Sequence, residues 1–194
     1  MPSAFGRTEI AKLHHFFNIK RIAQIFVTLV AGVILFACSV NPPDNVKPVT
    51  GFELNRYLGE WYEIARLDHS FEEGLSQVTA TYKMDGDQVK VINRGYEDKK
   101  GEWSEAEGTA KFVTDKTVGH LKVSFFGPFY GAYVIFELDK DNYQYAMISG
   151  DDYSYLWILS RTPTLDKAVL DSLIDKATEK GFDTSKLIMV NQSK

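Results

Sequence analysis

The sequence predicts an all-β fold: an eight-stranded antiparallel up-and-down β-barrel, with one C-terminal α-helix packed outside and a short last strand. Three observations predict it. Short β-rich segments follow one another from Gly59 onward, tight turn signals such as Asp85-Gly86-Asp87 separate them, and a single amphipathic helical pattern comes after them. Closing eight strands into a barrel removes the unpaired edges that promote aggregation.

The expected strands are rich in β-branched and aromatic residues, which favour a pleated, half-buried surface. They span residues 61–67, 78–84, 89–96, 105–113, 121–126, 133–138, 144–149 and 155–160.

The segment 165–180 differs, because its apolar residues repeat with the period of a helix. Thr164 is expected to cap this helix and Gly181 to end it. Its apolar stripe must cover the outside of the barrel, beside which residues 187–190 form the short last strand. The stripe consists of Val169, Leu170, Leu173, Ile174 and Ala177.

Composition limits the possible functions. The chain has 194 residues, 44% of them hydrophobic, which suffices for one domain with its own core. The net charge of −4 offers no basic surface for phosphates, so nucleic acid is not an expected partner. The single cysteine, Cys38, rules out an internal disulfide.

The first 37 residues are typical of a lipoprotein signal peptide. Lys20 and Arg21 precede an apolar run, residues 25–36, that is shorter than the ~20 residues a membrane span needs but suits the core of a signal peptide. Residues 35–38, Leu-Phe-Ala-Cys, resemble a bacterial lipobox, which implies cleavage before Cys38 and acylation of that cysteine. The alternative is a generic signal anchor in which the cysteine occurs by chance.

The residues after Cys38 predict where and how the chain is held. By resemblance to Gram-negative lipoproteins, Ser39 in place of aspartate implies an anchor in the cell outer membrane. Residues 38–50 contain Pro42, Pro43 and Pro48 and are expected to form a semi-extended linker. Residues 51–194 then form the barrel domain.

Three segments carry a family signature. Residues 57–66 read Tyr-Leu-Gly-Glu-Trp-Tyr-Glu-Ile-Ala-Arg, residues 133–139 read Tyr-Val-Ile-Phe-Glu-Leu-Asp, and residues 156–163 read Leu-Trp-Ile-Leu-Ser-Arg-Thr-Pro. In this order and spacing they resemble the lipocalins, and above all the bacterial outer-membrane lipoprotein lipocalins, which are similar to apolipoprotein D. The resemblance implies that Trp61 closes the barrel floor with Arg161 across its indole. Gly59 and Asp139 belong to the same structural signature.

The resemblance also implies a function. Lipocalins hold a small hydrophobic ligand, such as a fatty acid or a lysophospholipid, inside the barrel, without a cofactor or metal, and some of them as homodimers. Small residues mixed with aromatic ones on the expected inner face fit a lined cavity. The expected wall consists of Ala65, Val78, Ala80, Tyr82, Val91, Asn93, Ala110, Val123, Phe125, Tyr133, Ile135, Met147, Tyr155 and Trp157.

Polar and rim residues complete the expected site. Phe129 and Tyr130, in the loop before the sixth strand, are expected to form a lip for the ligand. The candidates to meet the polar head of a lipid are Arg66, His69 and Arg94. Glu63 and Glu137 share the alternation of the inward residues, so either they have partners or the alternation shifts there.

Catalysis is not expected. After Cys38 the histidines are His69 and His120, no motif ties them together, and no histidine pair has the spacing of a zinc site. Two alternatives to a lipid carrier remain: a structural envelope lipoprotein that needs no cavity, and a lipid-modifying enzyme.

Overall fold

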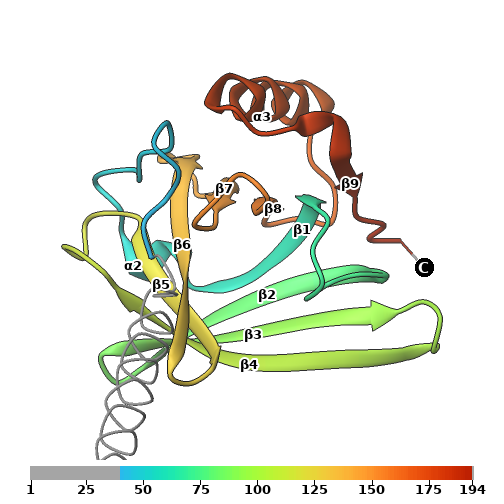
Figure 1. Cartoon of the computed structure of the whole chain (residues 1–194), viewed down its shortest axis with the longest axis horizontal. Helices are drawn as coiled ribbons and strands as arrows, with labels where there is room; N and C mark the ends of the chain where they lie inside the picture. The colour runs from blue at the N-terminus through green and yellow to red at the C-terminus, as the bar shows by residue number, and fades with distance from the viewer. Residues whose placement is uncertain (1–39, 194) are drawn as a thin grey trace, which may run out of the picture. The chain divides into compact units, whose positions relative to one another are not determined.

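A computed structural model describes residues 40–193, so the expectations for residues 1–37 and for Cys38 lie outside the described residues (Figure 1). The strands are β1 Gly59–Leu67, β2 Leu75–Asp85, β3 Gln88–Glu97, β4 Glu102–Phe112, β5 His120–Phe126, β6 Phe129–Leu138, β7 Tyr145–Ser149, β8 Leu156–Ser160 and β9 Leu187–Met189. The helices are α2 Leu54–Tyr57, α3 Lys167–Lys180 and the 3₁₀ turn Thr184–Lys186.

The strands form the predicted closed antiparallel barrel. Each strand from β2 to β8 pairs with the next, β8 pairs with β1, and β1 pairs with β2 to close the ring. The last strand, β9, lies outside this ring and pairs with Ala65, Arg66 and Leu67 of β1. No helix within residues 40–193 has the length and apolar character needed to cross a membrane.

Several expected boundaries were wrong, and two of them change the description of a hairpin and of the helix. Phe129 and Tyr130 were expected in a loop, but β6 begins at Phe129, which pairs with Phe126 across a tight hairpin. The helix begins two residues later than expected, at Lys167, because Asp166 rather than Thr164 caps it. The Asp166 carboxylate accepts hydrogen bonds from the backbone N–H groups of Ala168 and Val169.

Side chains on the barrel strands divide between two apolar clusters. One contains Trp61, Tyr82 and residues from all eight barrel strands, so it fills the interior. The other contains Leu173 and Ala177 of α3 and lies on the outer face of β1, β6, β7 and β8, where Figure 1 shows the helix over β7 and β8. Strands β7 and β8 therefore bury both faces.

Two β-bulges decide which side chains face inward. In β1 the register shifts between Glu63 and Ala65, so Ala65 turns outward and Arg66 turns inward opposite Trp157. In β6 it shifts between Ile135 and Glu137. Glu137 therefore faces α3, where Lys176 lies 2.7 Å from its carboxylate.

Residues 40–50, which belong to the expected semi-extended linker, pack against the barrel. The His120 Nε2 lies 2.7 Å from the carbonyl oxygen of Val40, and Val46 is buried in the outer cluster. The N–H of Val49 donates to the carbonyl of Ile135, and its carbonyl accepts from Gly119. These contacts join the segment to β5 and β6.

The floor of the barrel is a stack of Trp61 and Arg161. The guanidinium carbon of Arg161 lies 3.9 Å from the centre of the Trp61 ring, and its nitrogens donate to the carbonyls of Arg56, Leu58 and Glu60. A side chain at Gly59, whose φ is +99°, would lie 3.3 Å from this guanidinium.

Asp139 stabilises the turn that follows β6. Its two carboxylate oxygens accept hydrogen bonds from the backbone N–H groups of Asn142 and Gln144. The carbonyl of Tyr143 in this turn faces the Arg161 Nε at 3.3 Å, so the turn and the floor stack support each other.

Replacing Trp61 with alanine is expected to lower the free energy of unfolding by about 3–5 kcal/mol, since the side chain is fully buried and supports Arg161. Urea unfolding monitored by circular dichroism measures the effect. Trp103→Ala is the control, because Trp103 is 39% exposed, and it should cost much less. Equal midpoints for the two variants would contradict the role of Trp61 in the floor.

Candidate ligand site

Antiparallel topology divides the connections between two ends of the barrel. Residues 68–74, 98–101, 127–128 and 150–155 lie at one end, here called the mouth. Residues 86–87, 113–119 and 139–144 lie at the other, the closed end. Helix α2 belongs to the closed end, where Tyr57 and the flanking Phe52 join the interior cluster.

Most of the expected wall residues face the interior. Within the inner cluster, Tyr82, Val91, Ala110 and Ile135 are buried, and five others are half-buried: Ala80, Val123, Phe125, Tyr133 and Trp157. Asn93 pairs directly with Ala80 and so shares its face, and its side-chain oxygen is buried with no hydrogen-bond partner. Val78 is buried beside Gly95 on the same side.

Three expected wall residues lie elsewhere. Ala65 is in the outer cluster because of the bulge in β1, and Met147 is there because Ala146 and Ile148 are the inward residues of β7. All five residues of β7 are apolar or small, and both faces are covered, so the sequence shows no alternation to follow. Tyr155 precedes β8, and its ring stacks beside Trp157 at 6.0 Å, at the mouth.

Three tyrosine hydroxyl groups meet above the floor. The Tyr133 hydroxyl lies 2.7 Å from that of Tyr57 and 2.6 Å from that of Tyr82. Burial is the largest influence on these phenols, and it raises the pKa of all three above the ordinary value of 10.0. The hydroxyl groups therefore stay protonated and provide a neutral polar surface at the bottom of the interior.

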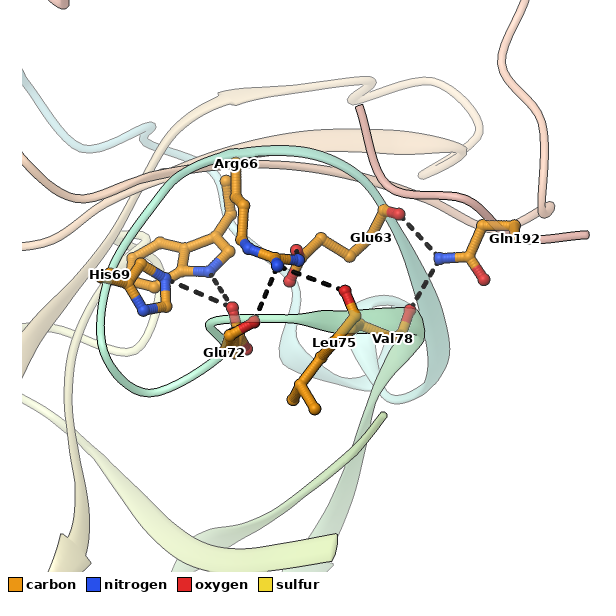
Figure 2. Close-up of polar contacts among 8 residues, drawn as sticks. Glu63, Arg66, His69, Glu72, Leu75, Val78 and Gln192 are labelled. Atoms are coloured by element: carbon orange, nitrogen blue, oxygen red, sulfur yellow. Dashed lines mark hydrogen bonds and ion pairs between the residues drawn. The ribbon is translucent and has the colours of Figure 1, made fainter. Parts of the chain in front are cut away.

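A cluster of charged groups lies inside the barrel near the mouth (Figure 2). Arg66 is 2% exposed and donates to the Glu63 carboxylate at 2.8 Å and to the carbonyl oxygens of Glu72 and Leu75. These two carbonyls belong to the β1–β2 connection and the start of β2. Arg66 therefore holds the connection 68–74 against the barrel.

The Glu72 side chain completes the cluster. Its Oε2 accepts a hydrogen bond from the Trp157 indole at 3.0 Å and lies 3.2 Å from the His69 Nε2. The two atoms are aligned too poorly for a hydrogen bond. The contact with His69 is an ion pair when the His69 ring is protonated. Two of the expected head-group residues, Arg66 and His69, thus meet in one cluster.

Arg94, the third expected head-group residue, does not join them. It is exposed, and its guanidinium lies 3.8 Å from the ring centre of Trp103 on the neighbouring strand. It pairs with Glu105 at a position that alternates with the inward Asn93. Arg94 therefore faces outward, in agreement with its alternation with Asn93, whereas Arg66 faces inward because of the bulge in β1.

The two buried glutamates have opposite pKa shifts. Burial, followed by repulsion from Glu72, raises the pKa of Glu63 well above 4.5 despite the nearby Arg66. Burial would also raise the pKa of Glu72, but His69, the Trp157 indole and Arg66 outweigh it, and the net pKa is lowered. The cluster thus favours one protonated and one ionised carboxyl group.

The interior has an apolar middle with polar groups on either side. An apolar wall lies between the tyrosine hydroxyls and the Glu63–Arg66–Glu72 cluster, and the Arg66 Nε and both His69 ring nitrogens lack hydrogen-bond partners. Within residues 40–193 no three metal-ligating side chains gather to form a metal site.

Sequence reasoning missed Tyr57 and Glu72. Tyr57 opens the first signature segment, but its inward position depends on the short helix α2, which four residues cannot signal by periodicity. Glu72 lies in a polar connection with no pattern at all, and a buried charge there is exceptional.

Together, the closed barrel, the stacked floor and the lined interior define a small-molecule-binding β-barrel protein. The chain belongs to the lipocalin family, because the family model described as "Lipocalin-like domain" matches residues 52–192.

Curated relatives cover nearly the same length. The chain is 59% identical over 169 residues to "Outer membrane lipoprotein Blc" of Vibrio cholerae, covering 87% of this chain and 98% of that protein. It is 48% identical over 174 residues to the protein of the same name from Escherichia coli K12, covering 89% and 98%. Apolipoprotein D of Mus musculus is 30% identical over 73% of this chain and 78% of its own length.

Solved structures share the fold. Insecticyanin from the tobacco hornworm Manduca sexta superposes with a TM-score of 0.64 at 27% identity, covering 79% of this chain and 87% of that chain.

The opposite pKa shifts predict opposite effects of two substitutions. The pKa of Glu72 is lowered, so its stabilising contribution is present above about pH 4.5 and is lost as the pH falls through the folded-state pKa. Glu72→Gln should therefore lower stability at pH 7 by about 1.5–3 kcal/mol, and the difference should vanish in acid. Urea unfolding between pH 3 and 8 measures it.

Glu63→Gln is the matched comparison. Because the pKa of Glu63 is raised, the stability that it contributes is present below about pH 4.5 and is lost as the pH rises through its folded-state pKa. The glutamine variant, which resembles the protonated form, should gain stability relative to the wild type as the pH rises. Parallel pH profiles for the two variants would contradict this account of the cluster.

Proposed function

We propose that this chain is an outer-membrane lipoprotein that binds small amphiphilic lipids, such as fatty acids or lysophospholipids, in its barrel and stores or transports them in a Gram-negative envelope. The observation that carries the proposal is the half-buried inner wall between two polar layers. A single acyl chain would lie along that wall, with its head group toward Arg66 and His69.

Burial of an acyl chain would supply the free energy of binding. Each buried CH₂ contributes about 0.8 kcal/mol before the cost of association is subtracted. The inner face supplies small residues, Ala80 and Gly108, beside larger ones such as Phe125. A side chain at Gly108 would meet Phe125 at 2.8 Å, so this glycine leaves room for the aromatic ring on the next strand.

A binding role is favoured over catalysis. In the described part of the chain, His69 contacts Glu72, whereas His120, the first residue of β5, contacts the carbonyl oxygen of Val40. The two histidines thus serve separate local structures and do not converge on one point. The matched relatives carry the names of lipoproteins and lipocalins.

Filling the interior is expected to abolish binding. Ala80→Trp should weaken the affinity for lysophosphatidylcholine and palmitic acid at least about tenfold, because the new ring would occupy the volume of the acyl chain. Thr81→Trp is the control, since one step along β2 places the same ring on the outside. Native mass spectrometry and tryptophan fluorescence of the delipidated protein measure both variants.

The outcomes separate three functional classes. Saturable one-to-one binding that Ala80→Trp removes supports the carrier. No binding by the wild type would leave a structural envelope lipoprotein, and equal binding by both variants would place the lipid outside the barrel interior. Release of a modified lipid would indicate an enzyme.

We propose that Cys38 carries the anchor. Cys38→Ser should move the protein from the membrane fraction to the soluble fraction and remove the mass of the acyl groups. Fractionation followed by intact-mass analysis is the measurement. A serine variant that stays in the membrane fraction would favour the uncleaved signal anchor instead.

A further inference from the structure

Three exposed aromatic side chains lie at the mouth of the barrel. Phe71 is 73% exposed, Phe126 is 82% exposed and Phe129 is 66% exposed. They come from the β1–β2 connection and from the β5–β6 hairpin. Large aromatic side chains at the tips of two loops, with most of their surface in water, are typical of a contact surface.

The aromatic side chains stand on opposite sides of the mouth. The β1–β2 connection and the β5–β6 hairpin are separated by four strands in either direction around the ring. A flat surface touches both Phe71 and Phe126 only when it meets the mouth end-on. A surface along the side of the barrel touches only one of them.

The neighbouring side chains indicate what kind of surface fits. Beside Phe129, the Tyr130 ring lies 4.9 Å from the Lys122 ammonium and 5.8 Å from the Lys111 ammonium. Both lysines lie in the closed-end halves of their strands, so they flank the side of the barrel and not its mouth. The mouth connections carry more acidic than basic residues, which disfavours an anionic surface: Asp68, Glu73, Asp98, Asp151 and Asp152, against Lys99 and Lys100.

The opposite end of the barrel receives the N-terminal segment. Val40 is held at His120, the first residue of β5, and Phe126 is the last residue of that strand. The seven residues of β5 span about 20 Å. The described chain therefore begins near the closed end, at Val40, and Cys38 comes two residues earlier in the sequence.

We propose that the mouth docks end-on, through Phe71 and Phe126, onto a zwitterionic lipid surface other than the leaflet that holds the anchor. The barrel then exchanges single-chain lipids with that second surface. This inference rests on the proposed function and on the lipidation of Cys38. The ligand passes from the surface directly into the barrel between the two aromatic loops.

Transfer between vesicles tests the proposal. The full lipidated chain is reconstituted in phosphatidylcholine acceptor vesicles and mixed with donor vesicles containing fluorescent lysophosphatidylcholine. We expect a transfer rate that rises with donor concentration and is slower for donors rich in phosphatidylglycerol. Phe71→Ala and Phe126→Ala should each slow transfer several-fold, and the double variant at least about tenfold. Met84→Ala, an exposed residue beside the closed end, is the control and should match the wild type.

Several results would overturn the proposal. Transfer that depends on Phe126 alone would mean that the barrel lies on its side against its own membrane. Transfer unchanged in the double variant would remove the aromatic rim as a docking surface. If the double variant sediments differently from the wild type but binds vesicles equally well, the aromatic rim is an interface between two copies of this chain.

A second measurement separates this inference from the proposed function. Binding of monomeric lysophosphatidylcholine, below its micelle concentration, should be the same within about twofold in the wild type and the double variant. If the wild type does not bind the monomer, the proposed function fails. If all variants bind it equally and transfer is also unchanged, only the docking inference fails.

Discussion

The bulge in β1 is the constraint on which the rest of the structure depends. Before it, β1 pairs with β2 and places Trp61 and Glu63 inside; after it, β1 pairs with β9 and turns Ala65 toward α3. The same shift brings Arg66 inside opposite Trp157. One extra residue thus allows a single strand to close the ring, support the helix and supply the interior charge.

The bulge also separates β1 from β2, and the C-terminal segment fills the gap. The Gln192 amide donates to the carbonyl oxygens of Glu63 and Val78, as Figure 2 shows, and the Asn191 carbonyl accepts from the Gln77 N–H. These carbonyls and N–H groups would otherwise lack partners between the diverging strands. The last residues are therefore part of the barrel wall.

Sequence alone predicted the strands, their order and the floor, because period-two alternation and three ordered signatures encode them. It failed where alternation breaks. Ala65 follows the extra residue of a bulge, which composition does not reveal, and Met147 lies in a strand that is apolar on both faces. For Glu137 the sequence analysis had left a shift of the alternation open, and the bulge in β6 produces it. Contacts between distant segments, such as Val40 with His120, leave no local pattern to find.

Burying the Arg66 charge costs desolvation free energy that an apolar residue at this position would not cost. Charges inside a fold are stable only when partners surround them, and a well-packed apolar core is often at least as stable. Here the arginine bonds to the carbonyls of the β1–β2 connection, whose Glu72 in turn holds Trp157 of the inner wall. The connection at the mouth and the inner wall are therefore joined by polar contacts, which, unlike apolar packing, fix direction. These contacts hold the connection in one position against the barrel.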